Sequence, residues 1–201
     1  AYPNQPMGRS ILGKTDIIKN ISRDAVEGFM KSFYRPDKMV FSVSGNFEEN
    51  HILELIDKHF LNLPQGTEDH SPKANYQGGE FRQNKDLEQV NIILGFEGVD
   101  FYSDLFYPTA VYSTVLGAGM SSRLFQEIRE KRGLVYSIFS GNIFLEDVGI
   151  FGIIAATGNN KIKELIPVLC DELINSPKNL SEEEILKAKA KLKFSLVKSL
   201  E

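Results

Sequence analysis

The sequence predicts an α+β fold, in which helices pack on mainly antiparallel sheets. Long stretches carry apolar residues at spacings of three and four, which is typical of amphipathic helices. Shorter runs rich in Val, Ile and Phe lie between these stretches and are typical of strands. Two such runs, residues 134–144 and 149–157, are joined by a short turn at Glu146 and Asp147. Helices and strands that alternate in this way indicate helices around a shared sheet.

The composition is that of a soluble globular protein. The chain has 201 residues, of which 42% are hydrophobic and 25% are charged, so it can bury a substantial core as one or two domains. The net charge of −4 gives no electrostatic reason to expect nucleic-acid binding. No apolar run approaches the roughly 18–20 residues that span a bilayer, so we expect no membrane span.

The cysteine content and the chain ends predict an intracellular fragment. The single Cys170 excludes an internal disulfide, and its apolar helical surroundings predict a buried thiol in a reducing compartment. The N-terminus carries no charged-then-apolar leader, so a cytoplasmic or other intracellular location is expected. The chain begins at Ala1 and stops at Glu201 within a helical pattern that has no glycine or proline stop. We therefore expect a chain truncated at both ends.

Residues 1–63 are predicted to form one part of the chain, with a helix, a strand and a second helix. Ser22 is placed to cap the first helix. Residues 40–44 alternate as a strand, and the second helix runs to about Phe60. Residues 64–79 then mix proline, glycine and polar residues without apolar periodicity, which predicts a linker.

Residues 80–201 are predicted to form a second α+β domain. It begins with a strand at 90–96, continues with a helix and the two strands named above, and ends with two helices. The last helix starts with a capping box, in which the side chains of Ser181 and Glu184 each accept a hydrogen bond from the other's backbone.

Residues 116–137 hold the most distinctive pattern of the chain. A glycine turn leads to Ser121 and Ser122, which are placed to cap a helix. Gly133 is placed to end this helix in the left-handed conformation. The strand that follows is expected to carry three residues on one side: Leu134, Tyr136 and Ile138.

This stretch resembles the second-domain signature of the pitrilysin/insulinase family of zinc metallopeptidases, in particular its mitochondrial-processing-peptidase-like branch. The matching positions are 117, 119–124, 128–134, 136 and 137. A second match, at residues 6–13, 18–24 and 33–40, resembles the end of the first domain in the same family. The resemblance implies a two-domain metallopeptidase architecture, of which this chain holds the end of the first domain and most of the second.

The resemblance also implies a zinc ion in the parent protein. The family binds zinc through two histidines four residues apart on a helix, with a glutamate between them as general base and a further glutamate as ligand. This chain has only His51, His59 and His70. His51 and His59 are separated by about 12 Å along a helix, too far to share one ion, and His70 lies in the predicted linker. We expect the zinc ligands upstream of Ala1 and no metal bound to this chain.

The site residues that the resemblance implies are Arg129 and Tyr136. In the family, an arginine and a tyrosine of the second domain bind the substrate backbone and help to stabilise the oxyanion, and the register assigns them to these positions. By spacing alone, Arg129 also fits a solvated helix face and Tyr136 a residue packed on the sheet. A phosphate loop is not supported, because Ser122 stands where a third glycine would be needed.

The functional hypothesis is a parent zinc metalloendopeptidase that cleaves extended or presequence-like polypeptides. It would act as a homodimer, or as a heterodimer with a family partner, and this fragment would be inactive alone. The alternative is a non-catalytic partner subunit or structural core protein of the same family, in which Arg129 and Tyr136 complete the other subunit's site. A third possibility is a binding module unrelated to proteolysis. The residues encoded upstream of Ala1 distinguish the first two, since only the enzyme requires an HxxEH segment there.

Overall fold

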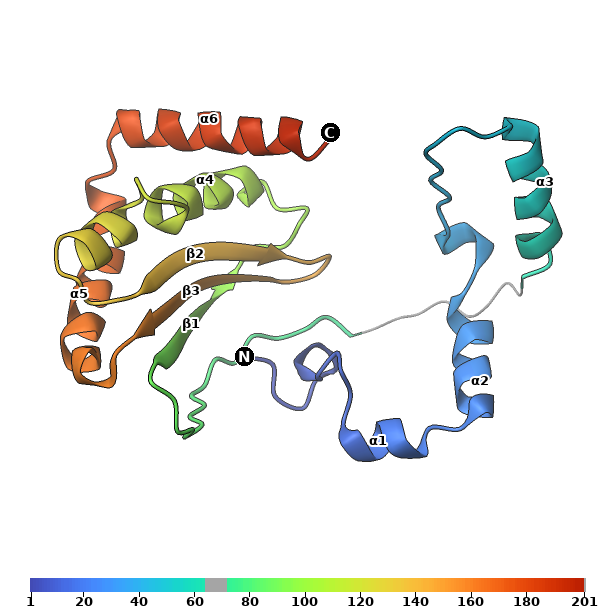
Figure 1. The fold of residues 1–201 in the computed structure, drawn as a ribbon, viewed down its shortest axis with the longest axis horizontal. Coiled ribbons are helices and arrows are strands. Elements are labelled where there is room, and N and C mark those ends of the chain that lie inside the picture. Colours follow the sequence, from blue (N-terminus) through green and yellow to red (C-terminus); the bar gives the residue numbers. More distant parts are fainter. Residues whose placement is uncertain (64–71, 201) are drawn as a thin grey trace. The chain divides into compact units, whose positions relative to one another are not determined.

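The computed structural model describes residues 1–63 and 72–200, which fall into two compact units. We call Ala1–Gly8 together with Lys73–Glu201 the sheet unit, and Arg9–Pro72 the helical unit (Figure 1). The predicted domain boundaries, 1–63 and 80–201, remain a prediction. Half of the predicted linker, residues 64–71, lies outside the described residues.

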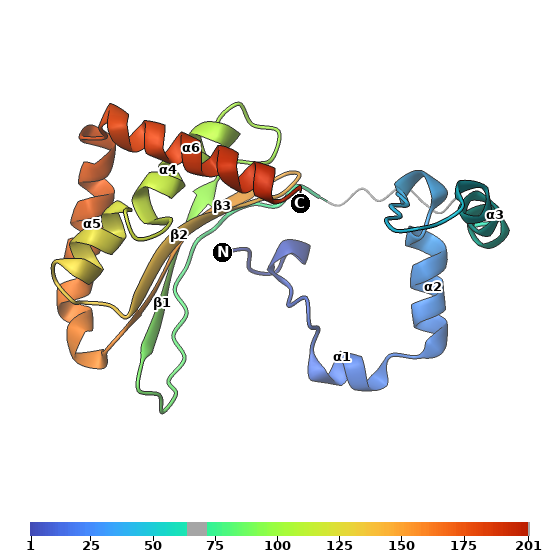
Figure 2. The same cartoon turned by 45° about the horizontal axis from the view of Figure 1, so that its top comes forward.

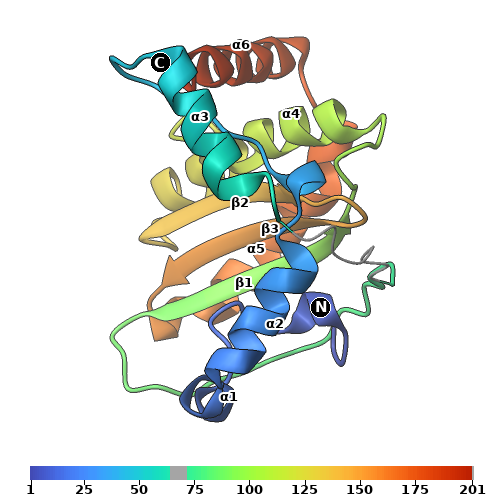
Figure 3. The same cartoon turned by 90° about the vertical axis from the view of Figure 1, so that its right-hand side faces the viewer.

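The sheet unit is built on three antiparallel strands. They are β1 (Val90–Gly98), β2 (Ser137–Phe144) and β3 (Gly149–Thr157). β3 lies between the other two, so the order is β1-β3-β2 (Figure 3). In this register Ile154 of β3 faces Ile93 on one side and Phe139 on the other. The small antiparallel sheet with its helices confirms the predicted α+β class.

The helices of this unit gather on one side of the sheet (Figure 2). They are α4 (Phe106–Gly117), the π-helix η3 (Phe125–Glu130), α5 (Ile162–Asn175) and α6 (Glu182–Lys198). The core between helices and sheet consists mainly of Leu116, Leu124, Ile128, Leu134, Ile138, Ile153, Leu165 and Leu169. The capping box of α6 is present, as predicted: Glu184 N donates to Ser181 Oγ at 3.2 Å, and Ser181 N donates to Glu184 Oε2 at 2.9 Å.

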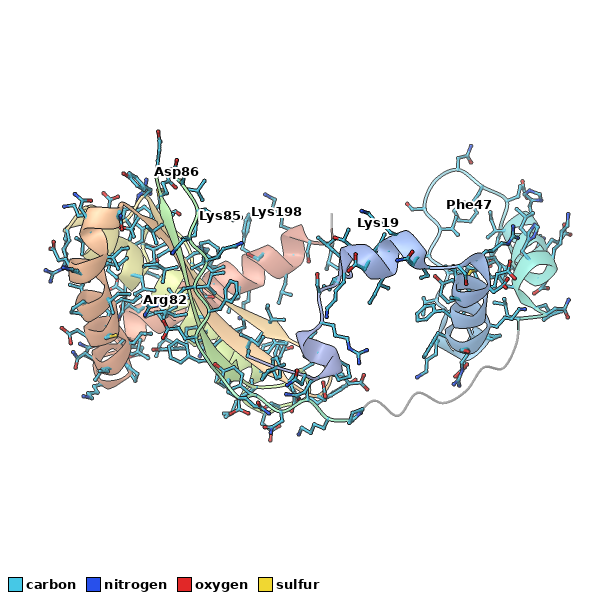
Figure 4. All side chains as sticks on the ribbon, turned by 90° about the horizontal axis from the view of Figure 1, so that it is seen from below. Lys19, Phe47, Arg82, Lys85, Asp86 and Lys198 are labelled. Carbon is cyan, nitrogen blue, oxygen red and sulfur yellow. The ribbon has the colours of Figure 1, made fainter. Side chains whose placement is uncertain are left out.

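Within the sheet unit, no described helix covers the opposite side of the sheet. Ile93 is 71% exposed, Phe139 48% and Ile143 54%. The segment that leads into β1 is also exposed and carries several charges, including Arg82 and Lys85 (Figure 4).

The N-terminal segment belongs to the sheet unit. Tyr2 is 4% exposed, and its hydroxyl donates to Gly149 O at the start of β3 at 3.4 Å. Gln5 and Asn75 exchange two hydrogen bonds, from Gln5 Nε2 to Asn75 O and from Asn75 N to Gln5 Oε1. The sequence grouped residues 1–8 with the segment that follows them, whereas these contacts attach them to residues 73–77 and β3.

The helical unit contains α1 (Thr15–Asn20), α2 (Arg23–Phe33) and α3 (Glu49–Phe60). Ser22 caps α2 as predicted, since its hydroxyl accepts from Ala25 N at 3.2 Å. The strand predicted at residues 40–44 does not form, because no neighbouring strand among the described residues supplies its ladder hydrogen bonds. No described residue of this unit is buried, although α2 carries a stripe of large apolar side chains.

We expect the helical unit to exchange its amide hydrogens almost as fast as an unstructured peptide. Isolated helices of 11 and 12 residues are marginal in water, and the helical unit taken by itself buries no described residue of either helix. Hydrogen exchange read by mass spectrometry should give less than about 10-fold protection in α2 and α3. The amides of β3 serve as the internal control and should show at least about 1,000-fold protection. Equal protection of the two units would contradict this expectation.

Candidate functional site

At the corner between η3 and β2, backbone hydrogen bonds join residues farther apart in the sequence than in an α-helix. Lys131 N donates to Gln126 O, five residues back, at 3.0 Å, which makes η3 a π-helix where the sequence indicated an ordinary helix. Leu134 N then donates to Ile128 O at 3.0 Å, across the turn at Gly133. Gly133 has φ +60°, so its predicted role as a left-handed helix end is confirmed. π-helical turns are frequent at functional sites.

The predicted serine caps are wrong. Ser122 Oγ donates to Gly119 O at 2.6 Å, so its hydroxyl closes the glycine turn. The residue before η3 is Leu124, and no described side chain caps this helix. The chain turns at Gly119, with φ +94°, and the Gly119 carbonyl lies within hydrogen-bonding distance of the Ser122 hydroxyl, which bonds to it in place of capping the helix.

Arg129 lies on the exposed side of η3. Its guanidinium carbon is 4.7 Å from the centroid of the Phe125 ring, within the range of a cation–π contact. The neighbouring Ile128 is fully buried in the core and fixes the turn that carries Arg129. The Arg129 guanidinium is thus exposed to solvent on a turn that the core holds in place.

Tyr136 lies immediately before β2 and is 59% exposed. Its backbone N–H donates to Ala156 O at 2.8 Å, and its hydroxyl lies beside Gly158, where an added Cβ would be 3.8 Å away. Leu134 and Ile138 are buried, whereas Tyr136, which the alternation predicts on the same side, is exposed. The alternation starts only at Ser137, because the bond to Ile128 holds the backbone of Leu134 in the helix end.

The structure leaves both predicted site residues accessible from solvent at the two ends of one corner. Among the described residues, no hydrogen bond, ion pair or ring contact joins the side chains of Arg129 and Tyr136. Arg129 lies over Phe125, and the Tyr136 hydroxyl lies near Gly158. Their polar donors are therefore accessible to a third group.

A second polar cluster, which the sequence did not single out, ties this corner to α6. Arg123 Nε donates to Glu184 Oε1 at 2.6 Å and Arg123 Nη2 donates to Glu184 Oε2 at 2.8 Å. The same guanidinium also donates to Asn179 O at 2.7 Å and to the Asn179 side chain. The hydrogen bonds from Arg123 lower the pKa of Glu184 to about 2. The capping box identified Glu184, but no local pattern relates it to a residue 61 positions away.

The residues that the structure describes do not fit a catalytic zinc ion. His51 and His59 are exposed on α3, and His70 lies outside the described residues. Among the described residues, no group of three or more His, Cys, Asp or Glu side chains could hold a metal ion. The helices described include none that is both long and apolar enough to cross a membrane.

Cys170 is exposed, so its predicted burial is wrong. α5 buries Leu165 and Leu169 against the core, which turns Cys170 and Ile174 outward. The sequence predicts an apolar face of this helix that includes Cys170. The observed buried face is narrower, because Cys170, one position after the buried Leu169, lies on the solvent side of the helix.

The comparisons with known proteins cover nearly the whole chain. The family described as "Peptidase M16 inactive domain" matches residues 20–192. A Rickettsia felis protein named "uncharacterized zinc protease" is 36% identical over 201 residues, which is 100% of this chain and 49% of that protein. The Bacillus subtilis protein named "uncharacterized zinc protease YmxG" is 32% identical over 202 residues, again 100% of this chain and 49% of the relative. The chain thus spans about half the length of these relatives.

Two solved structures share the fold. A protease from Helicobacter pylori matches with a TM-score of 0.74 at 25% identity, over 94% of this chain and 48% of that one. A peptidase M16 inactive domain protein from Pseudomonas fluorescens matches with a TM-score of 0.76 at 22% identity, over 96% and 48%. The resemblance inferred from the sequence motifs is confirmed at the level of the family: the chain belongs to the peptidase M16 inactive-domain family of the zinc metallopeptidases.

Proposed function

We propose that this chain is the substrate-contacting part of a zinc metalloendopeptidase that cleaves polypeptides, including presequence-like peptides. Family membership and relatives named zinc proteases support the reaction class. The observation that carries the assignment is the exposed Arg129 held over Phe125, at the same corner as the exposed Tyr136. The zinc ion would be bound by residues outside those described.

The two side chains suit the backbone of an extended peptide. A guanidinium carries five N–H donors in a planar fork, and a phenol adds an O–H donor. Both can donate to groups that gain negative charge when an amide is attacked, and preorganised donors of this kind stabilise such a charge. Because Arg129 already rests on Phe125, less side-chain freedom is lost when a peptide binds.

The alternative is a non-catalytic partner subunit of the same family, in which the same pair completes another subunit's site. The described residues offer no set of metal ligands. This finding is compatible with both proposals, because neither requires this chain to bind the zinc ion. The encoded residues before Ala1 distinguish them, since an HxxEH segment would support the enzyme. Association as a homodimer or as a heterodimer with a family partner belongs to either proposal.

Replacing Arg129 by alanine should weaken binding of a fluorescein-labelled presequence-like peptide about 10-fold, which is about 1.4 kcal/mol. Tyr136→Phe should weaken it about 3-fold, because it removes one hydrogen bond and leaves the ring. Fluorescence anisotropy with the 201-residue chain measures both dissociation constants.

Arg132→Ala is the matched control, because Arg132 is an exposed arginine of the same corner. If Arg129→Ala and Arg132→Ala weaken peptide binding equally, the effect comes from the loss of one positive charge at this corner. That result would contradict a specific role of Arg129. The wild-type chain with zinc and a quenched fluorogenic peptide should show no turnover. Zinc-dependent cleavage would show that this chain holds the metal, contrary to the proposal.

A further inference from the structure

We propose that an exposed aromatic surface between β1 and α4 binds a polypeptide segment in which Lys or Arg stands beside apolar side chains. The surface, which we call the aromatic platform, lies away from Arg129 and Tyr136 in the sequence and does not depend on their role. Its outer residues are Phe101, Tyr102, Leu105 and Tyr107, and its base is Phe106 and Phe144.

The platform is unusually exposed for its residue types. Tyr102 is 74% exposed, Tyr107 71% and Phe101 56%. These rings form one contiguous cluster, because Phe106 contacts three neighbours. Its ring centroid lies 4.2 Å from that of Phe144, 5.2 Å from that of Phe101 and 5.1 Å from that of Tyr107. Contiguous exposed apolar surface of this kind marks interaction sites in soluble proteins.

The loop that carries the platform is fixed by hydrogen bonds. Phe101 N donates to Leu145 O in the β2–β3 turn at 2.9 Å, and the two segments lie side by side (Figure 1). Tyr102 N donates to Asp100 Oδ1 at 3.0 Å, and Leu105 N donates to Ser103 Oγ at 3.2 Å. The rings are therefore displayed on an ordered loop, which lowers the entropic cost of binding a partner.

A negatively charged hollow adjoins the platform. It has a volume of about 260 Å³, and its lining includes Glu97, Asp100 and Asp147, with Lys73 as the cation. Tyr2 forms part of its wall, and burial together with the nearby carboxylates of Glu97 and Asp147 raises the pKa of the Tyr2 phenol. The same loop that forms the rim of the hollow, residues 98–103, continues into the platform.

Charge complementarity decides what kind of partner fits. Lys and Arg bind over the faces of tyrosine and phenylalanine rings and pair with carboxylates, while their neighbours' apolar side chains pack on the ring edges. An anionic membrane surface or a nucleic acid would be repelled by the carboxylates beside the rings. A basic, partly apolar peptide satisfies both the rings and the charges.

Anisotropy titration of the full chain with a labelled 15-residue peptide of alternating Leu and Lys or Arg tests the proposal. The Tyr102→Ala/Tyr107→Ala variant should weaken binding at least about 10-fold, and Asp100→Asn about 3-fold. Asparagine keeps the oxygen that accepts from Tyr102 N, so Asp100→Asn removes charge and leaves the loop intact. Raising the salt concentration should weaken wild-type binding.

The control is Phe194→Ala, because Phe194 is a 68% exposed aromatic residue on α6. It should bind the peptide like the wild type. Circular dichroism should give all variants the wild-type melting temperature, and Asp100→Asn keeps the test decisive should the double variant be destabilised. No binding to the wild type, or equal binding of a peptide with Glu in place of Lys and Arg, would overturn the proposal.

Two further outcomes distinguish the platform from the Arg129 site and from a dimer interface. Loss of peptide binding on Arg129→Ala but not on Tyr102→Ala/Tyr107→Ala would leave the proposed function standing and refute the platform. The reverse result would support the platform and count against Arg129. Concentration-dependent dimers by light scattering, abolished in the double variant while peptide binding persists, would assign the surface to a second copy of the chain and overturn the proposal.

Discussion

Replacing Gly117 by alanine is expected to lower the free energy of unfolding of the sheet unit by about 3 kcal/mol or more. Gly117 is the buried last residue of α4. An added Cβ would lie 2.5 Å from Ser140 Oγ and 2.9 Å from Ser140 Cβ, and closer still to the Ser140 amide nitrogen. Ser140 cannot move aside, because its backbone is in β2 and its hydroxyl donates to Ser113 O at 2.8 Å. The methyl group would push α4 away from the sheet.

Gly141→Ala is the matched control for this prediction. Gly141 is the residue after Ser140 in β2, and an added Cβ there meets nothing within 4 Å. It should be neutral within about 0.5 kcal/mol. Urea denaturation followed by circular dichroism gives both values. Similar stabilities for the two variants would mean that α4 does not pack against β2 through Gly117.

The second large effect is expected at Arg123. Its replacement by alanine should lower the free energy of unfolding by about 2–4 kcal/mol. The side chain of Arg123 is 17% exposed and that of Glu184 31%. Removing the guanidinium leaves the Glu184 carboxylate with only its capping partner, Ser181, and leaves Asn179 without its donors. Lys187→Ala is the control, because Lys187 pairs with Glu183 on the exposed face of the same helix and such pairs contribute little.

The same ion pair predicts how stability depends on pH. The hydrogen bonds from Arg123 hold the pKa of Glu184 at about 2 in the folded protein, against its ordinary 4.5 in the unfolded chain. Its contribution is therefore fully present above pH 4.5 and is lost as the pH falls from 4.5 towards 2. Solvent screening of the partly exposed carboxylate limits this contribution to about 1–2 kcal/mol.

Urea denaturation at about pH 6.5 and about pH 3 measures the effect. The wild type should lose more stability than Arg123→Ala over this interval, because the variant has already lost the pair. An equal loss in both proteins would contradict this prediction. It would mean that other carboxylates cause the loss of stability at low pH.

Local patterns were sufficient for much of the sheet unit. The strands predicted at 90–96, 134–144 and 149–157 are observed at 90–98, 137–144 and 149–157. These strands, the helix α5 and the capping box of α6 depend on residues close together in the sequence. The family was also readable from the motif at residues 116–137, and Arg129 and Tyr136 were named from it. Whether these two residues act on a substrate stays a prediction.

Other features depended on residues far apart in the sequence. The sequence predicts that Gly117 belongs to a turn, and only the approach of β2 shows why a side chain is excluded there. Arg123 and Glu184 are 61 positions apart, and no periodicity relates them. The strand expected at residues 40–44 had the right alternation, but a strand also needs a neighbour, and a segment's own sequence does not supply one.

The sequence by itself determined the secondary-structure class, the family and the residue types at the η3–β2 corner, because these follow from periodicity, glycine positions and a contiguous motif. Only the tertiary structure decided that Arg129 rests on Phe125, that Tyr136 is turned to solvent and that residues 1–8 pack beside β3. The physical reason is that exposure and packing depend on tertiary contacts between segments far apart in the sequence. The free energy that stabilises one set of such contacts comes from the burial of apolar surface across the whole unit.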